Sequence, residues 1–127
     1  MSTYFVGAFL LEEDMSKDDY HVIVYQILAY LYVKLKEGEK PDPEMLKPGS
    51  RYLEINESYW QYIMEHLYQD GYITGITIKK AWGNEDLICD LESCKITPKG
   101  IGYLCDNSFL QKAKEFLKEV KAIVPFT

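Results

Sequence analysis

The chain has 127 residues and carries 14 basic against 20 acidic side chains, a formal net charge of −6. A chain of this length buries a core as one domain without disulfide support, and its negative charge opposes binding to phosphate backbones unless its cations cluster. Its three cysteines, an odd number, argue against a disulfide framework and favour a reducing cytoplasm.

The first 14 residues read as an extension, followed by one domain over residues 15–127. The apolar stretch "YFVGAFLL" (4–11) leads into the acidic "LEEDMSKDD", and no charged region precedes it as it would in a signal peptide. This stretch and the apolar residues 20–35 are both shorter than the ~20 residues of a membrane-spanning helix. We therefore expect a cytoplasmic protein with no membrane segment.

A long helix is predicted from a start at Ser16, with Asp19 three residues later, to about Glu37, ahead of Gly38. It is apolar almost all round, so residues 4–11 or another protein chain should cover its second face. The main stripe is Tyr20, Ile23, Val24, Ile27, Leu28, Leu31 and Leu35, and the apolar residues off it are Val22, Tyr25, Ala29, Tyr32 and Val33.

Two further helices follow in the pattern of a helix-turn-helix. Asp42 and Pro43 begin a short helix that ends at Pro48-Gly49, "RYLEI" (51–55) suits a short edge strand, and Asn56 caps a helix over residues 56–70. The spacing of the apolar residues in that helix predicts which side chains are buried. They are Trp60, Ile63, Met64 and Leu67.

The next segment reads as a two-stranded wing. Residues 72–80 alternate as a half-buried strand, "WGNED" (82–86) contains the turn signal Gly83-Asn84, and "LICDL" (87–91) supplies the returning strand.

Two helices complete the predicted order. Thr97-Pro98 opens a short helix ending near Cys105, and Ser108 with Gln111 forms a capping box for the last helix, which Pro125 ends. The apolar stripe of the last helix is a core face or a dimer seam, and consists of Leu110, Ala113, Leu117, Val120 and Val124. The fold class is α+β: a winged helix with a helix-turn-helix core, a two-stranded wing and two C-terminal helices.

The sequence also resembles a known family. "YWQYIMEHLYQDGYITG" and "ITPKGIGYLCDNSFLQKAKEFLKEVKAIVPF" are similar to the YjcQ-type winged-helix proteins of Gram-positive bacteria and their phages, over roughly residues 18–125. The resemblance is strongest at Gly71-Tyr72-Ile73 and in the run from Ile96 to Lys118. It implies a winged-helix domain of phage or prophage origin with a DNA-binding or regulatory role, and supplies no settled site.

If the protein reads DNA, helix 56–70 and the wing should do so. The outward residues of that helix include Gln61, suited to an adenine edge, and Ser58, suited to a phosphate. No lysine or arginine lies between Tyr52 and Ile78, however, so the acidic side chains face a polyanion without compensation. The candidate phosphate contacts nearby are Lys47, Arg51, Lys79 and Lys80.

The same surface suits a protein partner, including a second copy in a homodimer. Aromatic side chains on the helix and at the wing tip form the kind of amphipathic surface that interfaces favour. The predicted recognition residues are Ser58, Gln61, Tyr62, Glu65, Gln69 and Trp82.

Metal and enzyme chemistry have little support in the sequence. Cys89 and Cys94 are separated by four residues rather than the two usual in zinc knuckles, and only His21 and His66 could complete a site. The sequence lacks a Gly-rich phosphate loop, an HExxH motif and a Gly-x-Ser-x-Gly elbow. We expect a non-enzymatic protein without catalytic residues, cofactor or metal.

Overall fold

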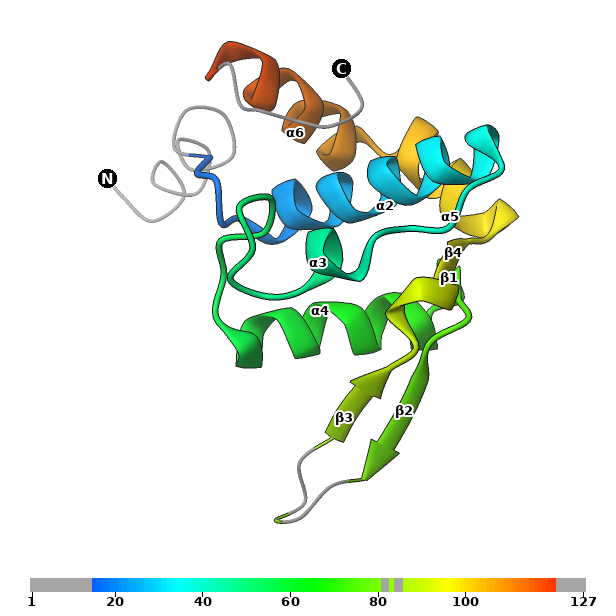
Figure 1. The fold of residues 1–127 in the computed structure, drawn as a ribbon. Coiled ribbons are helices and arrows are strands. Elements are labelled where there is room, and N and C mark those ends of the chain that lie inside the picture. The colour runs from blue at the N-terminus through cyan, green and yellow to red at the C-terminus, as the bar shows by residue number, and fades with distance from the viewer. Residues whose placement is uncertain (1–14, 81–82, 84–85, 121–127) are drawn as a thin grey trace.

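The computed structural model describes residues 15–80, 83 and 86–120 of the chain. In chain order its elements are α2 (Tyr20–Glu37), α3 (Pro43–Leu46), α4 (Glu57–Gln69), β1 (Ile73–Thr74), β2 (Thr77–Lys80), β3 (Asp86–Cys89), the 3-10 helix η2 (Leu91–Ser93), β4 (Lys95–Ile96), α5 (Pro98–Asp106) and α6 (Ser108–Glu119). The helix-turn-helix of α3 and α4 is followed by a β2–β3 hairpin, which is the arrangement of a winged helix (Figure 1).

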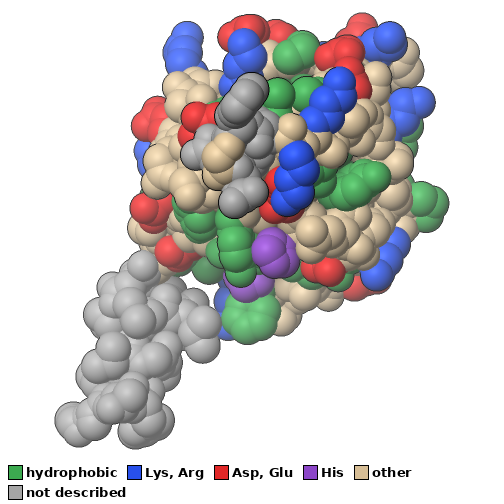
Figure 2. Space-filling model, turned by 90° about the horizontal axis from the view of Figure 1, so that it is seen from below, with side chains coloured by type: hydrophobic (Ala, Val, Ile, Leu, Met, Phe, Trp, Pro, Cys, Tyr) green, Lys and Arg blue, Asp and Glu red, His purple; other side chains and the backbone are tan. Residues whose placement is uncertain are grey.

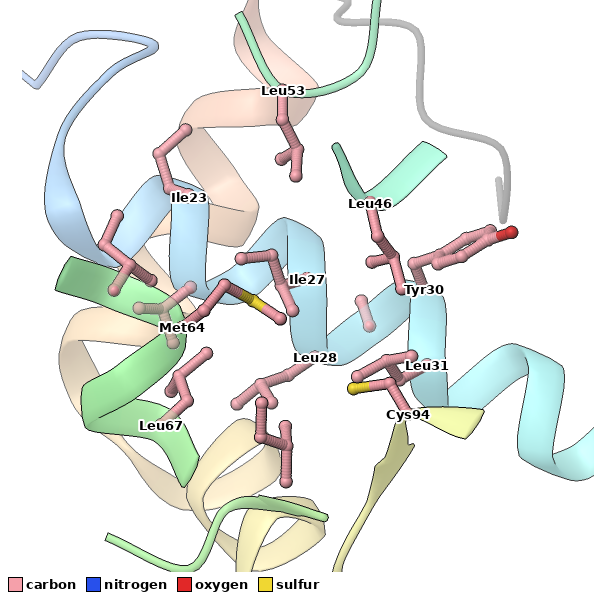
Figure 3. Packing of buried hydrophobic residues seen from close by; sticks show 14 of the residues in the cluster. Ile23, Ile27, Leu28, Tyr30, Leu31, Leu46, Leu53, Met64, Leu67 and Cys94 are labelled. Carbon is pink, nitrogen blue, oxygen red and sulfur yellow. The ribbon is translucent and has the colours of Figure 1, made fainter. Parts of the chain in front are cut away.

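Helix α2 is the centre of the fold, with α4 and the wing on one side and α6 on the other (Figure 1). Its apolar stripe, except for the exposed Leu35, packs against side chains from α3, α4 and the β-strands in one cluster, of which Figure 3 shows a part. Each large aliphatic side chain fully buried here contributes ~1.5–3 kcal/mol. All four residues predicted as the inward stripe of α4 are buried: Trp60, Ile63, Met64 and Leu67.

The second apolar face of α2 is partly covered by the chain's own last helix. Val22 is fully buried in a small cluster with Ala113 and Leu117 of α6. The prediction that residues 4–11 or another chain must supply this cover was therefore wrong for this part of the face. The stripe of α6 is a core face as far as Leu117, whereas Val120 is 40% exposed. Residues 4–11, Val124 and Pro125 lie outside the described residues.

Helix α2 begins one turn later than predicted. Asp19 is the N-cap residue, and its carboxylate accepts hydrogen bonds from the backbone N–H and hydroxyl of Ser16 in the preceding turn. Ser16 therefore does not cap the helix. The end is as predicted: Gly38 adopts the left-handed conformation at φ 72°, and its N–H donates to the carbonyl of Leu35.

The helix-turn-helix has the predicted caps but no edge strand. Asp42 accepts from the N–H of Glu44 at 3.0 Å, and Asn56 accepts from the N–H of Tyr59 at 2.9 Å. Residues 51–55 form irregular chain, because Leu53 bonds back to Ser50 and Gly49 instead of to a neighbouring strand. Burial of the apolar side chains of this segment, rather than ladder pairing, fixes it against the core. These side chains are Tyr52, Leu53 and Ile55.

The predicted strand over 72–80 is two strands in two different pairs. β2 pairs with β3 in register Thr77↔Cys89, whereas β1 pairs with β4 in register Ile73↔Ile96. The break falls at Gly75, where φ is 96° and the backbone passes so close to Ser93 that a Cβ atom would lie 1.9 Å from its carbonyl oxygen. The returning strand starts at Asp86, one residue early, and ends at Cys89 instead of 91.

The last two helices meet at a tight junction. Thr97 caps α5 as predicted, its hydroxyl accepting from the N–H of Gly100 at 3.0 Å. The capping box at Ser108 is wrong: Asn107 is the cap of α6, and its side chain accepts from the N–H groups of Phe109 and Leu110. Gln111 instead donates its amide to the carbonyls of Leu104 and Cys105, at 3.0 and 3.2 Å.

Candidate recognition surface of helix α4 and the wing

Gln61, on the outward face of α4, binds the wing, which is the β2–β3 hairpin. Its side-chain amide donates to the backbone carbonyl of Asp86 in β3 at 2.5 Å and to the carboxylate of Glu65 at 3.2 Å. A glutamine needs a free amide and carbonyl to read an adenine edge bidentately. The Gln61 amide, predicted to contact a base, is therefore engaged in holding the wing against α4.

The charge of Lys80, at the end of β2, is neutralised within the hairpin. Lys80 lies 2.9 Å from the carboxylate of its cross-strand partner Asp86. The hydrogen bond between them lowers the pKa of Asp86 and raises the pKa of Lys80, so both side chains stay charged and paired. Glu65 adds a second negative charge near Lys80.

Two of the four candidate phosphate contacts are thus engaged. Besides Lys80, Lys47 pairs with Glu44 at 2.8 Å, one turn away on α3. Arg51 and Lys79 are exposed and make no ion pair within the described part of the chain. Of the four candidates, these two would be left to meet phosphates.

The rest of the outward face of α4 is aromatic and acidic. Tyr62 is 55% exposed and Tyr68 41% exposed, and the ring of Tyr62 packs on His66 with centroids 4.2 Å apart. The other predicted residues of this helix, Ser58, Glu65 and Gln69, lie on the same surface, fully or partly exposed. On the wing Leu87 is 51% exposed. Trp82 lies outside the described residues.

Figure 2 views the molecule from the side of α4 and the wing. Blue and red side chains are interspersed on this face, without a continuous blue area among the described residues, and green side chains gather around the purple histidines. Such a surface is a poor track for a polyanion and resembles the aromatic, mixed-charge composition of protein interfaces.

Sequence reasoning missed Leu87 and Asp86. The sequence predicts Leu87 only as part of the returning strand. In the hairpin it pairs with Lys79, on the face that points away from the partly buried Ile78 and Ile88. The role of Asp86 depends on its backbone carbonyl and on a carboxylate facing Lys80 across the hairpin. No sequence pattern marks the contact of the carbonyl. The contact of the carboxylate can be predicted only when the strand register is known.

The thiols and carboxylates do not gather into a metal centre within the described residues, where no group of three His, Cys, Asp or Glu side chains is placed to hold an ion. Cys94 is buried, and burial raises the pKa of its thiol to about 12. No helix in the same part of the chain is long and apolar enough to cross a bilayer.

Several of the residues that carry the family resemblance meet between the end of α4 and the start of α5. The hydroxyl of Thr97 donates to the carbonyl of Gly71 at 2.5 Å, and its N–H donates to the carbonyl of Tyr72 at 3.0 Å. Tyr72 also stacks on Tyr103, with centroids 4.2 Å apart. A Cβ on Gly100 would lie 2.2 Å from the carbonyl oxygen of Tyr72. These residues join the helix-turn-helix to the C-terminal helices, a structural role.

The fold and this surface define a winged-helix protein of the α+β class. The sequence model of the family described as YjcQ protein matches residues 25–123, which include every element from α3 to α6. The chain therefore belongs to the YjcQ family. No curated protein and no solved structure matches it.

Proposed function

We propose that the protein acts through protein contacts made by the outward face of α4 and the wing. The observation that carries the proposal is that α4, placed where winged helices present their reading helix, exposes Tyr62 and Tyr68 and bears no lysine or arginine. Large aromatic side chains that combine an apolar ring with a polar tip supply much of the binding energy in protein interfaces.

The role that fits is accessory or regulatory, as in a small phage or prophage protein of the cytoplasm, without enzymatic activity or cofactor. The partner is a second copy of the chain or another protein. Membership of the YjcQ family and the modest size of the domain support this role. A winged helix hosts many functions, so the surface and not the fold is the basis of the proposal.

A DNA-binding regulator is the second candidate, favoured by the fold itself. Affinity for a duplex rises with the number of phosphates that cations neutralise, and log affinity falls with log salt in proportion. Of the four candidate phosphate contacts only Arg51 and Lys79 are unpaired among the described residues, so the contribution of these candidates to this electrostatic affinity is small. A fluorescence-polarisation titration of mixed-sequence duplexes at low salt is expected to stay flat, and salt-dependent binding would instead select this candidate.

Self-association is tested by sedimentation over a range of concentrations. If Tyr62 is an interface hot spot, Tyr62→Ala should weaken association by about 30-fold, which corresponds to ~2 kcal/mol. Leu35→Ala is the matched control, since Leu35 is also exposed, at 42%, but lies at the far end of α2. Equal weakening by both variants would contradict a role for the α4 surface.

A further inference from the structure

Among the described residues, α6 covers the second apolar face of α2 around Val22, in the first half of the helix. Beyond the cluster around Val22, the same face lines a groove of about 360 Å³ between α2 and the α5–α6 junction. The lining residues, all within the described part of the chain, are Tyr25, Ala29, Tyr32, Val33, Lys36, Leu104, Cys105, Gln111 and Lys114. A concave, mostly apolar surface with a few polar groups at its edge is typical of a binding site.

The hollow has a simple origin in the sequence of α2. Ala29 lies one turn from Tyr25 and one turn from Val33, so its methyl group leaves a space between larger side chains. On the opposite side of the groove, the Gln111 amide donates hydrogen bonds to the carbonyls of Leu104 and Cys105. These bonds fix the end of α5 in place. The groove therefore results from the packing of α2 against the α5–α6 junction.

Both charged side chains that line this groove are positive. Lys36 comes from α2, and its ammonium group lies 4.4 Å from the ring centroid of Tyr32. Lys114 comes from α6, is half-buried, and has no ion pair among the described residues. No carboxylate belongs to the lining. Two lysines without a carboxylate in the lining are unusual on a chain with a net charge of −6. An anionic partner would stabilise these lysines beside the apolar side chains of the groove.

We propose that this groove binds an acidic amphipathic segment of a partner protein. Apolar side chains of the segment fill the hollow over Ala29, and its carboxylates pair with Lys36 and Lys114. The volume is at the low end of the ~300–1,000 Å³ of small binding sites, which suits a few side chains of one helix or strand. Since α2 separates this groove from α4 and the wing (Figure 1), the site is independent of the surface proposed above.

The test is a nuclear magnetic resonance titration of the full chain with two synthetic peptides. Both carry one leucine stripe at helical spacing, and their remaining positions are glutamate in one peptide and lysine in the other. The glutamate peptide should shift the amide signals of Ala29, Val33, Leu104 and Lys114, and the lysine peptide should not. Shifts that are absent, equal for both peptides or centred on α4 would overturn the proposal.

Variants separate the charge from the shape of the site. Lys36→Glu combined with Lys114→Glu should weaken binding of the glutamate peptide by about tenfold or more, as for close charge pairs. Lys118→Glu, on the same helix but outside the lining, should leave the affinity within about twofold. Ala29→Leu should block binding by filling the hollow, with its fold checked by circular dichroism.

Alkylation of the cysteines gives a second readout. Cys105 is exposed at the edge of the groove, whereas Cys89 lies on the wing. The glutamate peptide should slow the reaction of Cys105 and leave that of Cys89 unchanged. Unprotected Cys105 would overturn the proposal. Nuclear Overhauser contacts from Ala29 to residues 1–14 or 121–127 without peptide would also overturn it, since the chain itself would then occupy the groove.

Discussion

Gln61 of α4 donates its side-chain amide to the backbone carbonyl of Asp86 in the returning strand β3. The wing is therefore oriented by the helix that it accompanies. A neutral hydrogen bond of this kind contributes ~0.5–1.5 kcal/mol. It makes α4 and the hairpin one surface, which a partner meets without first having to order the wing.

Removing this bond should loosen the wing alone. Gln61→Ala is expected to speed amide exchange in β2 and β3 by about fivefold, the equivalent of ~1 kcal/mol, with α2 unchanged. Gln69→Ala is the control, because Gln69 is exposed on the same helix and makes no side-chain hydrogen bond among the described residues. Equal exchange in both variants would show that the bond does not hold the wing.

Local signals in the sequence predicted the helices well. Asp42, Asn56 and Thr97 cap the helices assigned to them, and the 3–4 spacing identified the buried face of α4. These features depend on residues within one or two turns of each other, so a single segment contains the information.

The predictions that failed depend on contacts between distant segments. "RYLEI" has strand composition but no neighbouring strand, and the 72–80 strand breaks because the chain at Ser93 crosses it at Gly75. Gln61 has the chemistry of a base-reading residue, yet its amide is occupied by a carbonyl 25 residues later in the chain. Neither the crossing nor the carbonyl has a sequence pattern that marks it.

Gly75 should be the least replaceable glycine of the ribbon. Its φ of 96° strains any other residue, and an added Cβ would meet the backbone oxygen of Ser93, which cannot rotate away. Gly75→Ala is expected to lower the free energy of unfolding by about 3 kcal/mol or more in urea denaturation. Gly38→Ala shares the positive φ, at 72°, but has open space around it. Its cost should be only ~1 kcal/mol, and equal costs would refute the steric argument.

The cap of α6 gives a direct comparison between neighbouring residues. Asn107→Ala removes the acceptor of the N–H groups of Phe109 and Leu110, and should cost about 1 kcal/mol of stability. Ser108→Ala should cost a few tenths of that at most, since this exposed side chain has no cap bond in the structure. Thermal unfolding followed by circular dichroism distinguishes the two, and the opposite order would restore Ser108 as the cap.

Tyr103 should make the fold sensitive to alkali. Burial raises its pKa from 10.0 to about 12, and the nearby hydroxyls of Tyr20 and Tyr72 and the carboxylate of Asp70 add to the effect. The folded state therefore holds the phenolic proton at a pH where the unfolded chain has released it. The stability from this group is complete below pH 10 and is lost as the pH rises toward 12.

Tyr103→Phe keeps the ring that stacks on Tyr72 and removes the ionisable hydroxyl. Urea midpoints measured between pH 9 and about 12 should fall less steeply for this variant than for the wild type, while the two should differ little near neutral pH. The same variant should also remove a component near pH 12 from an ultraviolet titration of tyrosine ionisation. Parallel pH profiles would mean that the phenol of Tyr103 ionises equally in the folded and unfolded chain, and that its packing against Tyr72 does not shield it from water.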